Sequence, residues 1–133
     1  MPRLNVEKSG AIKGGFIDYT IECTGKITYN LKIKYKIGFL TNSFSKNGSY
    51  KFNREAAESI SYNEVGEITD LGHNTSAVVL LSNQGLSLVE IYSADYNVTG
   101  KAWINIHSSL ISFRRIEING KINGISVTVK ANE

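Results

Sequence analysis

Residues 27–39 read Ile-Thr-Tyr-Asn-Leu-Lys-Ile-Lys-Tyr-Lys-Ile-Gly-Phe. Every odd-numbered position is apolar, and every even-numbered position is polar or glycine. A helix, with its period of about 3.6, cannot sort such residues onto two faces, whereas a β-strand, with its period of 2, can. We therefore predict a strand that buries Ile33, Tyr35 and Ile37 in a core. The other face is predicted to present a basic surface to solvent, made of Lys32, Lys34 and Lys36.

Glycine-containing breaks recur along the chain, with β-rich runs between them. Short strands at such regular spacing indicate a sandwich or a barrel. The expected fold is all-β, an antiparallel β-sandwich or flattened barrel of about eight or nine short strands. We expect a single domain over residues 1–133, since the length is that of one domain. The strands are expected at 16–23, 26–39, 49–53, 59–65, 76–82, 86–93, 101–107, 111–118 and 121–130.

Two Asn-Gly pairs and one short polar stretch refine this layout. Asn119-Gly120 predicts a hairpin, because Asn-Gly suits a type I′ turn. The apolar alternation changes phase after Ile122, which predicts a β-bulge at Asn123-Gly124. The only helix candidate is the short stretch 53–59, of one or two turns, so helix should stay below about 12% of the chain.

The single cysteine and the N-terminal sequence limit the classes of protein to which this chain can belong. One thiol cannot form an internal disulfide, and Cys23 lies in a strand-like run, so we expect a small buried residue rather than a nucleophile. The first eight residues contain no apolar run, which predicts no secretory signal. No apolar run approaches the ~20 residues of a membrane-spanning helix. The location stays open between the cytoplasm and release by a non-classical route.

Charge is unevenly distributed along the chain. Residues 1–54 carry ten Lys and Arg against three Asp and Glu, whereas residues 55–100 carry seven acids and no base. One interpretation is that acidic and basic strands are neighbours and pair across the sheet. The other is a bipolar molecule whose basic face meets an anionic surface or the acidic face of another copy.

Nucleic acid is disfavoured as the anionic partner. Proteins that bind single strands combine basic side chains with aromatic rings on which the bases stack. Here Tyr29 and Tyr35 fall on the apolar face of their strand, opposite the lysines. The rings therefore cannot stack bases while the lysines hold phosphates.

No recognised catalytic motif is present. The two histidines, His73 and His107, belong to no zinc-binding spacing, and the chain contains no nucleophile elbow, P-loop or dinucleotide fingerprint. We accordingly expect no metal, no cofactor and no enzymatic activity. A small hydrolase with a site at the loop ends is kept as the third alternative.

The stretch 101–107, Lys-Ala-Trp-Ile-Asn-Ile-His, contains the best candidate site. Burial of its two isoleucines would leave Trp103, Asn105 and His107 together on the outer face. An exposed indole ring beside an amide and an imidazole suits a sugar, which packs its C–H face on the ring. Asp95 and Tyr96 could line the same rim. The alternatives are that Trp103 is buried and structural, or that it anchors a subunit contact.

The sequence thus favours a non-enzymatic binding module, lectin-like, that recognises a glycan or a cell surface in a homo-oligomeric assembly. Repeated weak sites would gain avidity in such an assembly. The alternative is a structural subunit that self-assembles through its segregated charges. Expected partners are a glycan, other copies of the chain, or an anionic surface, with no transmembrane segment.

Overall fold

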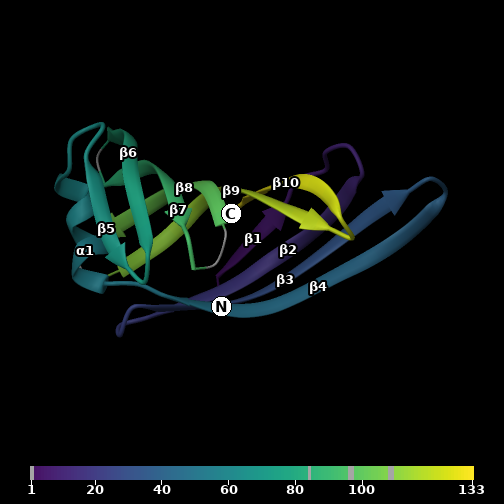
Figure 1. The fold of residues 1–133 in the computed structure, drawn as a ribbon, viewed down its shortest axis with the longest axis horizontal. Helices are drawn as coiled ribbons and strands as arrows, with labels where there is room; N and C mark the ends of the chain where they lie inside the picture. Colours follow the sequence, from purple (N-terminus) through teal and green to yellow (C-terminus); the bar gives the residue numbers. More distant parts are fainter. Residues whose placement is uncertain (1, 84, 96–97, 108–109) are drawn as a thin grey trace.

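The computed structural model describes residues 2–83, 85–95, 98–107 and 110–133, except for the side chain of residue 98. In this part of the chain ten antiparallel strands form one sheet, which curls into a half-barrel accompanied by one short α-helix (Figure 1). The all-β antiparallel prediction is confirmed, as is the single short helix. Within that class the strands form one curled sheet, nearer to the barrel alternative than to two stacked sheets.

The strands of the sheet are β1 (Arg3–Val6), β2 (Ile12–Glu22), β3 (Lys26–Ile37), β4 (Leu40–Lys51), β5 (Ile68–Gly72), β6 (Thr75–Asn83), β7 (Leu86–Ser93), β8 (Val98–His107), β9 (Leu110–Ile122) and β10 (Ile125–Asn132). Five strands (β2, β4, β6, β8 and β9) are longer than predicted, β3 and β10 are shorter, and β7 has the predicted bounds. Helix α1 (Arg54–Ser59) and the 3-10 helix η1 (Ile60–Tyr62) lie between β4 and β5.

The chain starts in the middle of the sheet and returns there. The strand order is β4-β3-β2-β1-β10-β9-β8-β7-β6-β5. The chain therefore runs outward from β1 to the β4 edge and crosses through α1 to the β5 edge. It then runs back strand by strand to β10, which pairs with β1 (Figure 1). The two edge strands, β4 and β5, have no second neighbour in this order, so the half-barrel stays open between them.

A polar cluster holds the central seam between β1 and β10. The Glu7 carboxylate accepts hydrogen bonds from the Arg115 guanidinium at 2.5 Å and from the Asn132 amide at 2.6 Å. Arg115 also donates to the Asn132 side-chain oxygen at 2.6 Å and to Glu117 at 3.2 Å. The hydrogen bond from Arg115, helped by that from Asn132, holds the pKa of Glu7 below its usual range. The cluster thereby joins the end of β1 to β9 and β10.

The alternating pattern of β3 faces inward as predicted for most of its length. Ile33 and Tyr35 are buried, and Lys32, Lys34 and Lys36 are exposed on the opposite face. The prediction that Ile37 is buried was wrong, because its exposed fraction is 44%. In the β2–β3 register the last pair toward the tip is Ile12 with Tyr35, so Ile37 has only β4 beside it.

The β9–β10 hairpin turn lies at Asn123-Gly124, so the prediction of a hairpin at Asn119-Gly120 was wrong. These residues lie inside β9, where the Asn119 amide oxygen accepts a hydrogen bond from the Thr128 hydroxyl at 2.8 Å. The β9–β10 turn is Asn123-Gly124, with φ of 49° and 80°, the left-handed values that a type I′ turn requires. The bulge predicted at this pair is therefore a turn.

Three further expectations were wrong. Cys23 is exposed in the turn after β2 rather than buried in a strand. The stretch 59–65 was expected as a strand, but η1 occupies its start, because Ile60 turns into the core and is buried. Of the strand expected at 49–53, residues 49–51 are the end of the long strand β4, whose Ser- and Asn-rich sequence hid its beginning, and residues 52 and 53 lie outside it.

Helix α1 forms where the sequence predicted it. The Asn53 side chain caps it by accepting a hydrogen bond from the Ala56 amide at 3.0 Å. One turn further on, Arg54 and Glu58 form an ion pair at 3.1 Å. Ala57, on the inner side of the helix, and Ile60, directly after it, are buried against the concave face of the sheet.

The two faces of β3 should differ sharply in their contribution to stability. The substitution Ile33→Ala removes a side chain that is 1% exposed, and we expect it to lower the free energy of unfolding by roughly 2–5 kcal/mol. Lys34→Ala, on the exposed face, should change it by less than about 0.5 kcal/mol. Urea unfolding of the two variants measures both values, and equal losses would contradict the observed register.

The seam cluster should contribute to sensitivity to acid. The folded state lowers the pKa of Glu7, so its contribution to stability is present above the unfolded pKa, near 4.3, and is lost as the pH falls through the folded value. We expect Glu7→Gln to flatten the decline of stability below about pH 4.3. Denaturant unfolding at a series of acid pH values tests this. Glu64→Gln, in an exposed turn, is the control and should leave the decline unchanged.

Candidate functional site

The outer face of β8 carries three of the predicted site residues in a row. Ala102, Ile104 and Ile106 are buried. The alternate residues point the other way, with Trp103 and Asn105 half-buried and His107 exposed. The three side chains therefore share the outer face of the strand, as the alternation predicted.

The Trp103 ring is covered on one side by a neighbouring strand. Arg115, its partner on β9, places its guanidinium carbon 5.6 Å from the ring centroid. Leu88 is its partner on β7. The ring is thus neither fully open nor part of the core, and a cation already lies over it.

Asp95 lies away from the end of this row. It belongs to the turn between β7 and β8, where its carboxylate accepts a hydrogen bond from the Asn74 amide at 2.8 Å. His107 ends β8, whereas Asp95 precedes its start, so the fold does not bring them together. Tyr96, the fifth predicted site residue, lies outside the described residues.

The charge segregation of the sequence persists across the sheet. The basic strands β3 and β4 form one end of the sheet order, and strands of the acidic stretch 55–100 form the other, with β5 at its edge. Lys101 is an exception, since its register partners are Glu90 and Glu117. Among the described residues, the ion pair between the two segments is the local one of Arg54 with Glu58.

The concave face of the half-barrel contains a groove of about 430 Å³. This volume falls within the range of small-molecule sites, roughly 300–1,000 Å³. Aliphatic and aromatic side chains dominate its lining. Several of them are only partly buried, which leaves apolar surface open to the groove; these include Ile27, Tyr29, Leu31, Phe44, Ile91 and Ile118.

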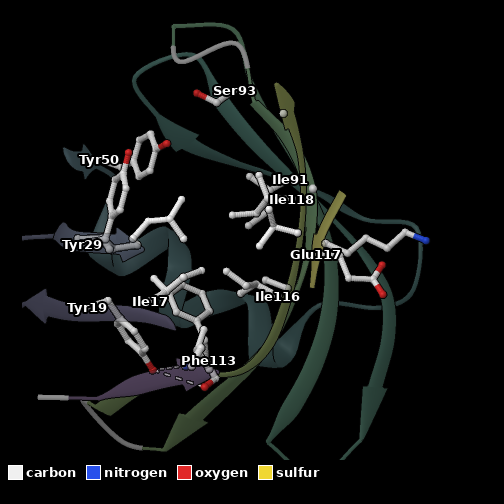
Figure 2. Close-up of a pocket in the computed structure, with 18 of the residues that line it drawn as sticks. Ile17, Tyr19, Tyr29, Tyr50, Ile91, Ser93, Phe113, Ile116, Glu117 and Ile118 are labelled. Carbon is white, nitrogen blue, oxygen red and sulfur yellow. Dashed lines mark hydrogen bonds between the residues drawn. The ribbon is translucent and has the colours of Figure 1, made fainter. Parts of the chain in front are cut away.

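The groove has two walls that come from the two halves of the sheet. Figure 2 shows Tyr29 and Tyr50, from β3 and β4, facing Ile91 and Ile118, from β7 and β9, across the space. The two tyrosine rings stack with their centroids 5.3 Å apart. Tyr29 lies over Gly48, where a Cβ atom would come within 2.6 Å of the Tyr29 hydroxyl oxygen. Glycine at this position therefore sets the place of the Tyr29 ring.

One side of the groove is closed by a hydrogen-bonded ring pair. The Tyr19 hydroxyl accepts a hydrogen bond from the Phe113 amide at 2.8 Å, and the two rings lie 5.2 Å apart (Figure 2). Burial raises the pKa of Tyr19 above its usual value, so the phenol stays neutral at physiological pH. The pair gives this part of the groove an apolar surface whose polar atoms are already satisfied.

Lysine supplies the positive charge of the groove. Lys46 pairs with Leu31 in the β3–β4 register, so its side chain projects on the same side as the apolar wall. Lys101 and Glu117 are register partners on the opposite face of the sheet, and Figure 2 shows the Glu117 carboxylate pointing away from the groove. The groove thus combines a long apolar surface with an exposed cation on the edge strand β4.

Sequence reasoning missed the groove for a physical reason. An apolar side chain at an inner strand position looks the same in sequence whether it fills the core or lines an open space. Tyr29 and Leu31 were therefore assigned to the core. Lys46 is a signal that could have indicated the groove, because it is a charged residue in the alternating inner positions that Phe44 and Tyr50 also occupy. The sequence did not predict the first part of strand β4, so this signal was missed.

The described residues show no metal centre, since no three His, Cys, Asp or Glu side chains among them gather closely enough to hold an ion. None of the helices in this part of the chain is long and apolar enough to cross a membrane. No protein-family model, curated protein or solved structure matches this chain.

The position of Trp103 predicts intermediate behaviour. We expect Trp103→Ala to cost about 1–2 kcal/mol, more than a surface change but less than the 3–5 kcal/mol of a fully buried ring. Trp103→Phe keeps a ring beside Arg115 and should cost less. Urea unfolding measures both, and iodide should quench the Trp103 emission only in part. Complete resistance to iodide would contradict the half-buried position.

Proposed function

We propose that the protein is a non-enzymatic binding module whose concave groove holds an amphipathic anion with a long apolar tail, such as a fatty acid. One observation carries the proposal: the groove is lined by aliphatic and aromatic side chains, and Lys46 projects on the same side. An apolar tail would cover the partly buried wall, and an anionic head would meet the lysine.

The energetics favour a chain-like ligand. Each methylene group moved from water into an apolar site contributes roughly 0.8 kcal/mol, so a long tail supplies most of the affinity. The exposed lysine adds little energy of its own, typically about 0.2–1 kcal/mol for an exposed ion pair. Its role is to orient the ligand and to select anions.

Glycan recognition at Trp103, Asn105 and His107 stays a prediction. The Arg115 guanidinium occupies space near the Trp103 ring, which limits stacking of a sugar there. A glycan array tests this lectin-like alternative directly. The hydrolase alternative needs an activated nucleophile, and in the described part of the chain neither His73 nor His107 is hydrogen-bonded through its ring to a carboxylate.

Self-assembly is a second candidate, supported by the opposite charges of the two open edges. Copies could associate through contacts between the basic side of one sheet and the acidic side of the next. Such contacts should weaken with salt, because screening acts over about 8–10 Å at physiological ionic strength. Light scattering at about 20 mM and about 500 mM salt, which bracket that range, tests the idea.

The groove should bind a long-chain fatty acid saturably, with displacement of a fluorescent acyl probe as the measurement. We expect Lys46→Glu to weaken fatty-acid binding about three- to tenfold, since it reverses a charge worth up to about 1 kcal/mol. Binding of the corresponding long-chain alcohol should change little. Gly48→Ala should weaken both ligands, because the new methyl group displaces the Tyr29 ring.

Lys32→Glu is the matched control. It makes the same charge change on the neighbouring strand but on the outer face, so fatty-acid affinity should stay as in the unmodified protein. If the unmodified protein shows no saturable fatty-acid binding, the proposed function is wrong.

A further inference from the structure

The tip of the β3–β4 hairpin exposes three large apolar side chains within four residues. The exposed fractions are 44% for Ile37, 99% for Phe39 and 71% for Leu40. Single exposed apolar residues are common on protein surfaces and need no explanation. A cluster at the end of a protruding element is different, because contiguous exposed apolar patches commonly mark interaction sites.

This tip stands clear of the rest of the sheet. Strand β2 accompanies β3 only as far as the pair Ile12 with Tyr35, and Lys36 makes a last hydrogen bond to the Ala11 carbonyl at 2.8 Å. Beyond that point β3 and β4 continue as a two-stranded projection, which Figure 1 shows reaching past the other strands at the right of the view. The end of the hairpin can therefore contact another surface without any rearrangement of the remaining strands.

Lysines follow the apolar tip along the hairpin. Residues 26–51 contain six lysines and no acidic residue. Lys32, Lys34 and Lys36 are exposed on one face, and no ion pair involves them among the described residues. The hairpin therefore carries a positively charged surface directly behind its apolar tip.

We propose that this hairpin docks the protein on an anionic lipid bilayer, with Phe39 and Leu40 among the acyl chains and Lys36 and Lys34 at the headgroup phosphates. Apolar side chains that insert about 5–10 Å and basic residues that remain near the surface are the two features that bind peripheral proteins to membranes. Neither feature alone gives stable binding, and the hairpin has both.

The spacing along the strand fits this depth. Ile37 pairs with Leu40 and Lys36 with Thr41, so at roughly 3.3 Å per residue the Lys36 backbone lies about 3 Å behind the level of Leu40, and that of Lys34 lies about 7 Å further back. With Phe39 inserted, Lys36 reaches the headgroup level and Lys34 remains within one screening length of it. Lys32 lies further away, so the contributions should fall in the order Lys36, Lys34, Lys32.

A bilayer fits this tip better than a protein partner. Stable protein interfaces bury about 800 Å² on each side, which requires a broad complementary surface. A turn of four residues at the end of two strands is narrow and convex. A fluid bilayer needs no matching shape, and its anionic headgroups complement the lysines.

The test is flotation with vesicles of phosphatidylcholine containing phosphatidylserine, compared with phosphatidylcholine alone. We expect binding to the anionic vesicles only, reduced at high salt. Phe39→Ser combined with Leu40→Ser should lower the partition coefficient at least tenfold. The fold should be unaffected, because both side chains are largely exposed. The matched control is Leu110→Ser, whose side chain is 70% exposed elsewhere, and it should bind as the unmodified protein does.

Charge reversal gives a second arm. Lys36→Glu should weaken vesicle binding more than Lys32→Glu, and Lys26→Glu, at the far end of the same strand, should have little effect. Phe39→Trp should report insertion by a blue shift of its emission on addition of anionic vesicles, measured in a Trp103→Phe background.

Three outcomes would overturn the proposal. The first is no binding to anionic vesicles, and the second is an equal loss of binding for the Leu110→Ser control. The third is that Phe39→Ser alters the self-association of the protein in the absence of vesicles. The last result would assign the tip to a second copy of the chain. The proposal does not depend on the groove, since the Phe39 and Leu40 variants should keep their fatty-acid affinity.

Discussion

The pairing of β1 with β10 is the constraint on which the remaining structure depends. It joins two meanders, β1 to β4 and β5 to β10, into one continuous sheet. The β1–β10 register is short, comprising Asn5 with Asn132 and Val6 with Ala131, and the Glu7 cluster extends it with side-chain hydrogen bonds. Without this seam, the two walls of the groove would belong to two separate sheets. The curl that brings Tyr29 opposite Ile91 follows from their union in one twisted sheet.

Open edges explain how a half-barrel can be both folded and accessible. A closed barrel would hide its inner surface, and a flat sheet would leave all of that surface in water. Here α1 and η1 turn Ala57 and Ile60 into the concave side, while the gap between β4 and β5 leaves the groove reachable. Exposed edges invite unwanted pairing, and charged side chains are a common protection. Strand β4 carries Lys46 and Lys51 and is rich in serine and asparagine.

Local sequence patterns predicted the parts of the fold that local chemistry determines. The alternation around Ile33 identified β3, and the short stretch 53–59 was the helix candidate that became α1. The choice between two Asn-Gly pairs was wrong because both suit a type I′ turn, and only the register of β9 with β10 selects Asn123. The groove escaped prediction altogether, since it depends on which distant strands face each other. The row of Trp103, Asn105 and His107 was predicted from alternation alone, whereas the position of Arg115 over the ring comes from pairing with β9.

The seam has a consequence for the order of folding. Glu7 and Asn132, which it joins, are 125 residues apart in the chain. Each meander can form from neighbouring hairpins, which close quickly, but the seam requires the closure of nearly the whole chain, and contacts of this kind slow folding. During synthesis the strands β1 to β4 emerge first, and β1 stays unpaired on one side until β10 has been synthesised. Until β10 leaves the ribosome, the centre of the future sheet is an unpaired edge, and it is there that a nascent chain would be most exposed to misassociation.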